Sequence, residues 1–298
     1  MKKILITGNN SFLGTSLLRY LTEKGDYEIE NIDLRDGGWN KVDISNYDSL
    51  FYVAGIAHLD TYRNRNEKEK YYSVNTRLAI EVAKKAKADG IKQFIFVSSI
   101  IIYGRSTRQD ISRVITKDTR PRPENYYGLS KLEAEKGIRE LEDDSFKVCI
   151  IRSPMVYGEH CKGNYPKLRN VALKINLFPY IANQRSMIYV GNLMEFIRLM
   201  IENEERGIFY PQNLEYVNTS ELVKTIALCH GRNIKLVKGF GRMIRLLSRF
   251  SGTFLRVFGN MTIDMELSEY KNEYRFFDFN ESVKRTESKW MIERGYAK

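Results

Sequence analysis

Tyr127 and Lys131 are the side chains of this sequence whose types and spacing best suit proton transfer. If they lie on one helix, a separation of four residues puts both on the same face. A free phenol has a pKa near ~10, and a neighbouring ammonium favours the phenolate, so we expect Lys131 to lower the pKa of Tyr127. The phenol could then take a proton from a sugar hydroxyl or return one to a ketone, while Ser99 donates a second hydrogen bond to the same oxygen.

The pair alone is a weak signal, because the chain contains 19 Tyr and 48 Lys plus Arg. A solvated helix turn with a partly buried tyrosine would have the same spacing. The elements that would position the pair must therefore decide between these two interpretations.

The N-terminal residues predict a strand, a glycine-containing turn and a helix. Lys3–Thr7 is a short apolar run, and helical spacing begins at about Ser16. This arrangement aims backbone N–H groups and a helix N-terminus at a pyrophosphate. The first glycine allows the tight turn and the last allows close helix–sheet packing. The cofactor contacts predicted in this turn are Gly8, Asn10, Ser11, Phe12, Leu13 and Gly14.

Asp33 follows a second predicted strand, residues 27–32, and lies about 20 residues beyond Gly14, where an acidic residue would hold the adenosine ribose. A plain turn residue explains Asp33 equally well. Arg35 leaves room for a 2′-phosphate, so the sequence predicts NAD and keeps NADP open. Further cofactor contacts are predicted at Asp43 and at a small-residue turn after a buried strand, Ala54 and Gly55.

The central part of the chain predicts a parallel sheet. Phe94–Ser99 is continuously apolar, as strands covered on both faces are, and Ser99 lies at its carboxyl end, where open α/β sheets bind ligands. A long helix is expected over residues 66–90. Only seven residues separate Asp43 from Phe51, whereas a parallel crossover takes about a dozen or more, so either the usual helix or one of the strands is missing there.

These elements predict an α/β fold, a Rossmann-like doubly wound parallel sheet with a smaller C-terminal α+β region. We expect residues 1–153 to form the dinucleotide-binding domain, with a return segment at about 186–212. Residues 154–185 and 213–298 are expected to form the substrate-binding region. Helices are predicted over residues 189–202, in the return segment, and from Thr219 to about Cys229, in the substrate-binding region.

Composition limits the classes of protein that remain. The 298 residues are 43% hydrophobic and 29% charged, without an apolar run near the ~20 residues of a membrane span. Three scattered cysteines favour a reducing cytoplasm, and no metal-ligand spacing accompanies them. The net charge of +11 attracts polyanions, but no nucleic-acid-binding motif supports a nucleic-acid partner.

Part of the positive charge forms one helical stripe over residues 242–258, made of Arg242, Arg245, Arg249 and Arg256 beside an apolar stripe. This pattern is typical of a helix that docks on an acidic membrane surface. A cap helix with solvated arginines explains the same spacing, and we favour that interpretation because Gly252 interrupts the run.

The ordered set of motifs resembles a known family. It comprises Gly8…Gly14, Asp33, Ala54-Gly55, Asn75, the run Ser98–Gly104, Tyr127…Lys131 and Val156-Tyr157-Gly158. The chain is similar, over about residues 1–215, to the extended short-chain dehydrogenase/reductases, the NAD-dependent epimerase/dehydratase family that acts on nucleotide sugars. The resemblance implies that Tyr127 is the catalytic acid/base, Lys131 its ribose-binding partner and Ser99 the third member of the triad.

The resemblance also implies roles for three further residues: Asn75 at the cofactor, Asn164 near the nucleotide diphosphate and Arg185 on the pyrophosphate. Two departures matter. Ser11 stands at the family's middle glycine, where it either loosens the approach of the pyrophosphate or caps the helix. Ile100-Ile101 stand where the sugar 4,6-dehydratases carry Asp-Glu, and neither can protonate a leaving hydroxyl, which argues against dehydration.

The expected function is therefore hydride transfer at carbon 4 of a UDP-sugar, with a 4-epimerase favoured. A UDP-4-keto-6-deoxy-N-acetylhexosamine 4-reductase is the alternative, and a non-catalytic dinucleotide sensor on the same fold is the third possibility. Family members are commonly dimers through the Tyr127 helix and the long helix before it, so the resemblance implies a homodimer.

Overall fold

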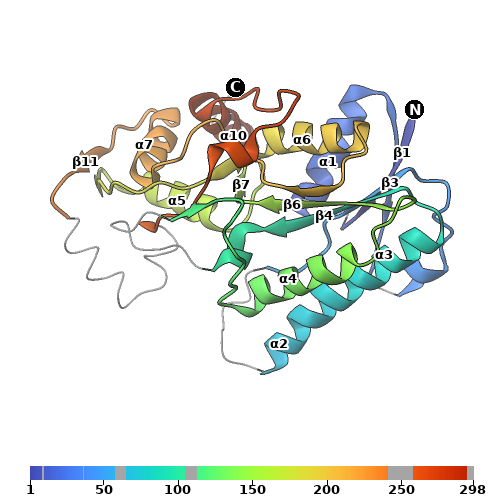
Figure 1. The fold of residues 1–298 in the computed structure, drawn as a ribbon. Helices are drawn as coiled ribbons and strands as arrows, with labels where there is room; N and C mark the ends of the chain where they lie inside the picture. Colours follow the sequence, from blue (N-terminus) through green and yellow to red (C-terminus); the bar gives the residue numbers. More distant parts are fainter. Residues whose placement is uncertain (9, 36, 58–64, 105–112, 241–257, 294–298) are drawn as a thin grey trace. The chain divides into compact units, whose positions relative to one another are not determined.

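The computed structural model describes the chain except for residues 9, 36, 58–64, 105–112, 241–257 and 294–298 (Figure 1). It divides into two compact units. Unit 1 comprises residues 1–104, 120–153 and 194–211, and unit 2 comprises residues 105–119, 154–193 and 212–298. The predicted segment 242–258 lies outside the described part of the chain except for Phe258, so all four arginines of its stripe are outside it.

Unit 1 is built on a six-stranded parallel sheet in the order β2-β1-β3-β4-β6-β10. The chain order reverses between β1 and β3, which makes this the switch point at which open α/β sheets bind ligands. The strands are β1 (Lys2–Thr7), β2 (Tyr27–Ile32), β3 (Ser49–Tyr52), β4 (Gln93–Ser99), β6 (Lys147–Ser153) and β10 (Gly207–Phe209). The predicted Rossmann-like doubly wound sheet is therefore confirmed.

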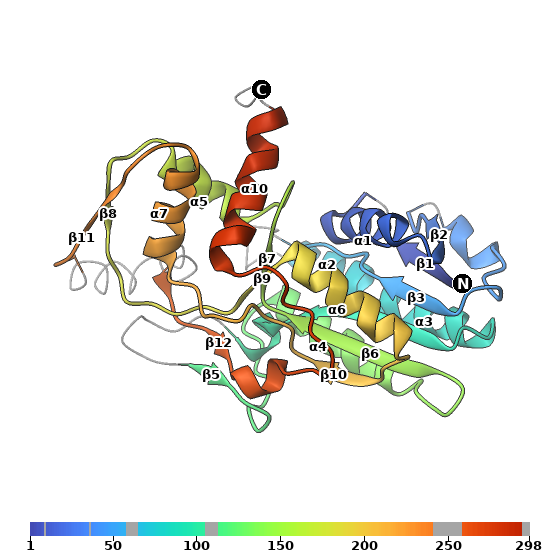
Figure 2. The ribbon, with the colours of Figure 1, turned by 90° about the horizontal axis from the view of Figure 1, so that it is seen from above.

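Helices cover both faces of this sheet, which explains why its central strands are apolar throughout. On one face lie α1 (Phe12–Lys24) and α6 (Val190–Glu202). On the other lie α2 (Arg65–Tyr71), the π-helical turn η2 (Tyr72–Arg77), α3 (Leu78–Ala88) and α4 (Tyr126–Arg139) (Figures 1 and 2). Phe94 and Phe96 of β4 are completely buried in the core beneath α3 and α4.

The connection from β2 to β3 contains only one short 3₁₀ helix among its described residues, η1 (Gly38–Lys41). Both alternatives that the short spacing left open are correct, because the described residues of this connection contain no α-helix. Val42–Ile44 is also not a strand. Trp39 of η1 is buried and takes part of the space beside α3, and a shallow groove between η1 and α3 remains open at the surface.

The C-terminal part of α6 and strand β10 complete unit 1 from a distant part of the sequence. β10 pairs with β6 along the edge of the sheet. The buried amide of Gln93 donates to the carbonyl oxygens of Met200 at 2.8 Å and Glu205 at 2.9 Å. The hydroxyl of Tyr20 in α1 donates to Glu195 of α6 at 2.6 Å.

Unit 2 consists of three helices and three small two-stranded parallel sheets among its described residues, seen from above in Figure 2. The helices are α5 (Asn164–Ala172), α7 (Thr219–Cys229) and α10 (Phe279–Glu293). The strand pairs are β8 (Leu177–Pro179) with β11 (Lys235–Val237), β5 (Val114–Ile115) with β12 (Thr262–Ile263), and β7 (Met155–Tyr157) with β9 (Met187–Tyr189). The helix predicted from Thr219 to about Cys229 is confirmed as α7, and its N-cap is Asn218.

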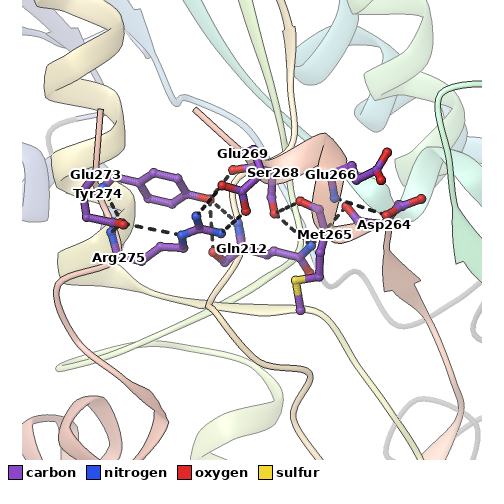
Figure 3. Close-up of polar contacts among 9 residues, drawn as sticks. All are labelled: Gln212, Asp264, Met265, Glu266, Ser268, Glu269, Glu273, Tyr274 and Arg275. Carbon is purple, nitrogen blue, oxygen red and sulfur yellow. Dashed lines mark hydrogen bonds and ion pairs between the residues drawn. The ribbon is translucent and has the colours of Figure 1, made fainter. Parts of the chain in front are cut away.

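Buried polar side chains tie unit 2 together. Glu287 of α10 accepts hydrogen bonds from Tyr165 at 2.8 Å and Arg169 at 2.7 Å, and its carboxylate lies 2.7 Å from a ring nitrogen of His230. A second group surrounds Gln212 and Tyr274 beside the 3₁₀ helix η4 (Met265–Ser268) (Figure 3). The Tyr274 hydroxyl accepts from the Gln212 N–H at 3.2 Å and donates to the Ser268 carbonyl at 2.9 Å.

Candidate active site

Helix α4 begins in a way that fixes the position of Tyr127. The side chain of Asn125 accepts a hydrogen bond from the Gly128 N–H at 2.6 Å, which caps the helix. A Cβ atom on Gly128 would lie 2.9 Å from the carbonyl oxygen of Ile101, so only glycine lets α4 approach η3 (Ile100–Tyr103) this closely. The first turn of α4 therefore lies against the segment that follows Ser99.

Ser99 and Tyr127 meet at the carboxyl end of β4. Ser99 lies close enough to Tyr127 to lower the pKa of its phenol, and the Ser99 hydroxyl accepts the Ile101 N–H at 3.3 Å, which caps η3. The ring of Tyr71, at the end of α2, packs against Tyr127 with 6.1 Å between the ring centroids. The structure therefore brings together two of the predicted catalytic residues and adds a second tyrosine beside them.

The pKa of Tyr127 moves in the direction opposite to the prediction. Burial raises it to about 12, Tyr71 adds to the increase, and Ser99 opposes it. The expectation that Lys131 lowers this pKa is therefore wrong for the protein chain by itself. The physical reason is that loss of hydration penalises the phenolate more than the neighbouring groups stabilise it.

Lys131 lies one turn further along α4 and is almost completely buried, with 6% of its surface exposed. Its ammonium donates to the carbonyl oxygen of Val97 at 2.8 Å and lies 4.6 Å from the centre of the Phe96 ring. Burial lowers its pKa to about 8, and the nearby Glu135 carboxylate opposes this decrease. A Cβ atom on Gly55 would lie 3.6 Å from the ammonium, so Lys131 reaches the end of β3 as well as β4.

The turn from β1 to α1 has the geometry of a phosphate-binding turn. Gly8 has a φ of 72°, and its carbonyl oxygen accepts the Ser11 N–H at 2.8 Å. A Cβ atom on Gly14 would lie 2.6 Å from that same carbonyl oxygen. Ser11 is the N-cap of α1, and its hydroxyl accepts the Gly14 N–H at 3.0 Å, so the capping alternative for Ser11 is the correct one.

The N–H groups of Phe12 and Leu13 belong to the first turn of α1, where an α-helix provides no acceptor of its own. That turn contains no acidic side chain, so it suits an anion. Asn10 is exposed immediately before the cap. These residues fit the pyrophosphate of a dinucleotide.

Asn75 connects the end of β3 to α4. Its side chain accepts the Ile56 N–H at 2.8 Å and donates to the Ile56 carbonyl at 3.0 Å and to the Ser130 hydroxyl at 3.1 Å. The loop that contains Ala54 and Gly55 is thereby fixed against the helix of Tyr127. Asn75 is fully buried and lies in the π-helical turn η2, a kind of turn that is common at functional sites.

Asp33 lies directly after β2 and is held by Arg35. The Arg35 guanidinium donates to both carboxylate oxygens of Asp33, with its Nε 2.9 Å from each, and holds the pKa of Asp33 down at about 2. Asp43 is exposed, and its carboxylate accepts the Ser45 N–H at 2.9 Å, which lowers its pKa.

Two predicted substrate contacts belong to unit 2. Asn164 is the first residue of α5 and follows Gly163, which has a φ of 95°. Arg185 is partly buried, and its backbone pairs with Val217 at 3.1 Å and 2.8 Å. Burial lowers the pKa of Arg185 to about 10.

Sequence reasoning missed several residues that position the site. Thr7 accepts the N–H groups of Val53 at 3.1 Å and Ala54 at 3.4 Å, which links the ends of β1 and β3. Glu135 follows Lys131 on the same face of α4, and its spacing of four residues was the available signal. The contact between Tyr71 and Tyr127 had no signal in the sequence.

The described residues contain neither a metal cluster nor a membrane span. No group of three or more His, Cys, Asp or Glu side chains among them could hold a metal ion. In the same residues, no helix combines the length and the apolar character needed to cross a membrane.

Comparison with known proteins identifies the family. The model of the NAD-dependent epimerase/dehydratase family matches residues 4–210. A UDP-glucose 4-epimerase of Vibrio cholerae is 30% identical over 249 residues, which are 76% of this chain and 75% of that protein. A UDP-2-acetamido-2,6-beta-L-arabino-hexul-4-ose reductase of Pseudomonas aeruginosa is 25% identical over 211 residues, which are 66% of this chain and 49% of that protein.

Solved structures agree on the fold. A UDP-glucuronic acid 4-epimerase from Bacillus cereus, solved in complex with NAD, superposes with a TM-score of 0.72. The match covers 99% of each chain at 15% sequence identity, so it shows the fold alone. The family match over residues 4–210 shows that this chain belongs to the NAD-dependent epimerase/dehydratase family.

Proposed function

We propose that this protein is a nucleotide-sugar 4-epimerase that uses NAD and acts on carbon 4 of a UDP-sugar. The observation that carries the proposal is the position of Tyr127 beside Ser99 at the carboxyl end of β4, close enough for Ser99 to act on the pKa of the phenol, with Lys131 buried on the same helix. The 30% identity to a UDP-glucose 4-epimerase over three quarters of the chain supports the choice of reaction.

In this proposal, the dinucleotide lies across the switch point between β1 and β3. The first turn of α1 binds the pyrophosphate through backbone N–H groups. Asp33 accepts the adenosine ribose hydroxyls and thereby favours NAD over NADP, because a 2′-phosphate beside a carboxylate would be repelled. The further proposed contacts are Asp43 near the adenine, Ala54 and Gly55 where the backbone approaches the cofactor, and Asn75, which holds that loop.

The proposed role of Lys131 is to bind the nicotinamide ribose and to place a positive charge near the phenol. The nicotinamide, when bound, supplies a hydride acceptor and later a hydride donor. Its positive charge when oxidised also favours the phenolate, which opposes the effect of burial on Tyr127.

The protein residues then handle the proton. Tyr127 takes the proton of the sugar 4-hydroxyl as the C4–H hydride leaves, and Ser99 donates a hydrogen bond to the oxygen that becomes the ketone. After the keto sugar presents its other face, hydride returns to C4 and Tyr127 returns the proton to the oxygen. The cofactor ends in its starting redox state, so atoms and electrons balance without another reactant.

We also propose that Asn164 and Arg185 bind the nucleotide diphosphate of the substrate. A guanidinium matches two phosphate oxygens in a bidentate contact. Burial around Arg185 would strengthen that contact, because an anion compensates the charge that desolvation penalises.

A 4-keto-reductase is the second candidate, and the likeness to the reductase of Pseudomonas aeruginosa favours it. The same residues would then run in one direction, with Tyr127 donating the proton while NADH or NADPH supplies the hydride. A 4,6-dehydratase is less well supported, because Ile100 and Ile101 at the start of η3 offer no acidic group.

Cofactor accounting distinguishes the two candidates. Purified protein with NAD is incubated with UDP-glucose or UDP-N-acetylglucosamine, and the sugar is followed by proton NMR while absorbance is read at 340 nm. The proposal predicts the 4-epimer with no net change in absorbance. Stoichiometric loss of NAD(P)H on addition of a UDP-4-keto sugar, without epimer formation, would instead establish the reductase.

We further propose that the protein works in the cytoplasm as a homodimer. All three cysteines are free thiols, which is the state expected in a reducing compartment. The dimer would form through α3 and α4, as the resemblance to the family implies. Light scattering during size-exclusion chromatography tests it, and a mass near 34.9 kDa would show a monomer instead.

A further inference from the structure

A buried ion pair lies next to the candidate catalytic residues in unit 1. Glu135 of α4 and Arg152 of β6 are 2% and 7% exposed. The Arg152 guanidinium donates to the Glu135 carboxylate in a bidentate arrangement, with its Nη2 2.7 Å from one oxygen and its Nε 3.1 and 3.2 Å from the two oxygens. Burying two charges has a high desolvation cost, so the pair needs an explanation beyond simple packing.

The pair holds both ends of the segment that contains Ser99. At one end, the Ser98 hydroxyl donates to the Glu135 carboxylate. At the other end, Arg152 donates to the Tyr103 hydroxyl at 2.6 Å, and Tyr103 is the last residue of η3. Ser99 lies between these two anchors, so the position of its hydroxyl depends on the ion pair.

The same carboxylate lies one helical turn beyond Lys131. The Lys131 ammonium donates to the carbonyl of Val97, the residue before Ser98, so the two side chains approach neighbouring positions of β4 from the same helix. Glu135 raises the pKa of Lys131 against the effect of burial.

The other titratable groups on the packed elements are Tyr127 on α4, Tyr71 on α2, Tyr103 on η3 and Arg152 on β6. Tyr71 acts on Tyr127 and makes its phenolate less favourable. Arg152 donates to both oxygens of the Glu135 carboxylate and to the hydroxyls of Tyr103 and Tyr210. Glu135 is therefore the group that provides the negative charge for Lys131.

We propose that Glu135 is a positioning residue for Ser99, Tyr127 and Lys131, which orients the Ser99 segment through Ser98 and Arg152 and places its carboxylate one helical turn from Lys131. The catalytic part of this inference rests on the proposed function. Its electrostatic part, the coupling between Glu135 and Lys131, is a property of the folded chain and can be measured without turnover.

The first test is the pH profile of Glu135→Gln, which keeps the shape of the side chain and removes its charge. The alkaline limb of kcat/KM should move to lower pH by about 0.5–1 unit, because Lys131 loses the carboxylate that stabilises its ammonium. Glu135→Asp keeps the charge and should restore the limb toward its original position.

The matched control is Glu195→Gln. Glu195 is also a buried carboxylate of unit 1, bonded to Tyr20 at 2.6 Å and to Arg198 at 2.7 Å, but it belongs to α6, which covers the opposite face of the sheet from α4 (Figure 1). The Glu195→Gln variant should have a lower free energy of unfolding than wild type, but its pH profile of kcat/KM should be unchanged. If Glu135→Gln behaves in the same way, Glu135 is merely structural and the proposal is wrong.

The second test uses unfolding in urea and needs no substrate. The variants Lys131→Met, Glu135→Gln and their combination form a double-mutant cycle, measured at pH 7 and pH 10. We expect a favourable coupling at pH 7 that is largely lost at pH 10, where Lys131 is neutral. Equal coupling at both pH values, or none, would overturn the electrostatic role. Loss of all sugar chemistry with the coupling intact would instead reject only the proposed function.

Glu135→Gln leaves the Arg152 guanidinium buried without its carboxylate and could prevent folding. If the single variant does not fold, the double variant Glu135→Gln/Arg152→Gln, which removes both charges, replaces it in both tests. Because Glu135 is the charge that acts on Lys131, this double variant should move the alkaline limb in the same direction. An unmoved limb in a folded double variant would overturn the proposal.

Discussion

At the scale of single residues, the environment of Tyr127 is the main difference between the sequence and the structure. The spacing of Tyr127 and Lys131 correctly predicted one helix and one face. It did not reveal that burial would raise the pKa of the phenol to about 12 and lower that of the ammonium to about 8. Burial depends on residues such as Tyr71, which is far away in the sequence and whose contact has no local signal.

The pKa of Lys131 predicts how stability depends on pH. Because its pKa falls from 10.5 in the unfolded chain to about 8 in the folded one, the unfolded state binds more protons between these values. The contribution of Lys131 to stability therefore increases as pH rises through this window. Relative to Lys131→Met, the wild type should gain roughly 3 kcal/mol of unfolding free energy between pH 7 and pH 11.

Urea unfolding at several pH values measures this gain. Lys136→Met is the control, because Lys136 is exposed on the same helix and should leave the pH dependence unchanged. A pH dependence that is the same in wild type and Lys131→Met would contradict the account of Lys131 as a buried, destabilised cation.

At the scale of elements, the sequence predicted most strands and helices but not their irregularities. The predicted helix over residues 66–90 is interrupted by the π-helical turn η2. Only part of its apolar stripe is fully buried: Val82 and Ala86 of α3 lie in the core, whereas Val74 of η2 and Leu78 are half-buried. The short spacing between Asp43 and Phe51 raised the possibility of a missing crossover helix, but residues 33–48 are long enough to hold one, so chain length alone did not decide its absence.

The β1–α1 turn gives a prediction at this scale. Gly14→Ala would place a methyl group 2.6 Å from the backbone oxygen of Gly8, so the turn must open. We expect a loss of about 2 kcal/mol of stability or more and a clear weakening of NADH binding. Urea unfolding and the fluorescence of bound NADH measure the two effects.

The control for this prediction is Gly25→Ala at the other end of α1. Gly25 has a φ of 81°, and a Cβ atom there would meet no other atom within 4 Å. The change should therefore cost about 1 kcal/mol through backbone strain alone. Its NADH affinity should equal that of wild type. Equal NADH affinities for both variants would mean that the turn does not bind the cofactor.

At the scale of the whole molecule, the order of motifs predicted the Rossmann-like sheet, and the structure confirms it. The long-range ion pairs were not predictable. Arg152 pairs with Glu135, 17 residues away, and Arg169 pairs with Glu287, 118 residues away. A charged residue in a sequence does not indicate which distant partner compensates its burial, so neither pair has a sequence signature.

Unit 1 is discontinuous in sequence, which predicts the behaviour of a fragment. Residues 1–153 lack β10 and the part of α6 that accepts hydrogen bonds from the buried Gln93 amide. The fragment would leave β6 as an open apolar edge, which favours aggregation. We expect no cooperative thermal transition by circular dichroism, and a sharp, reversible one would show that the returning segment is dispensable.

The central claim is that the Tyr127 phenol transfers the proton at carbon 4, and Tyr127→Phe tests it most directly. The measurement is the single-turnover rate of the variant beside that of Tyr126→Phe, which alters the adjacent tyrosine, with NADH affinity determined for both. The account predicts a rate lower by about 10²–10⁴ for Tyr127→Phe, unchanged NADH binding, and a near-normal rate for Tyr126→Phe. A folded Tyr127→Phe protein that turns over within about twofold of wild type would contradict the account.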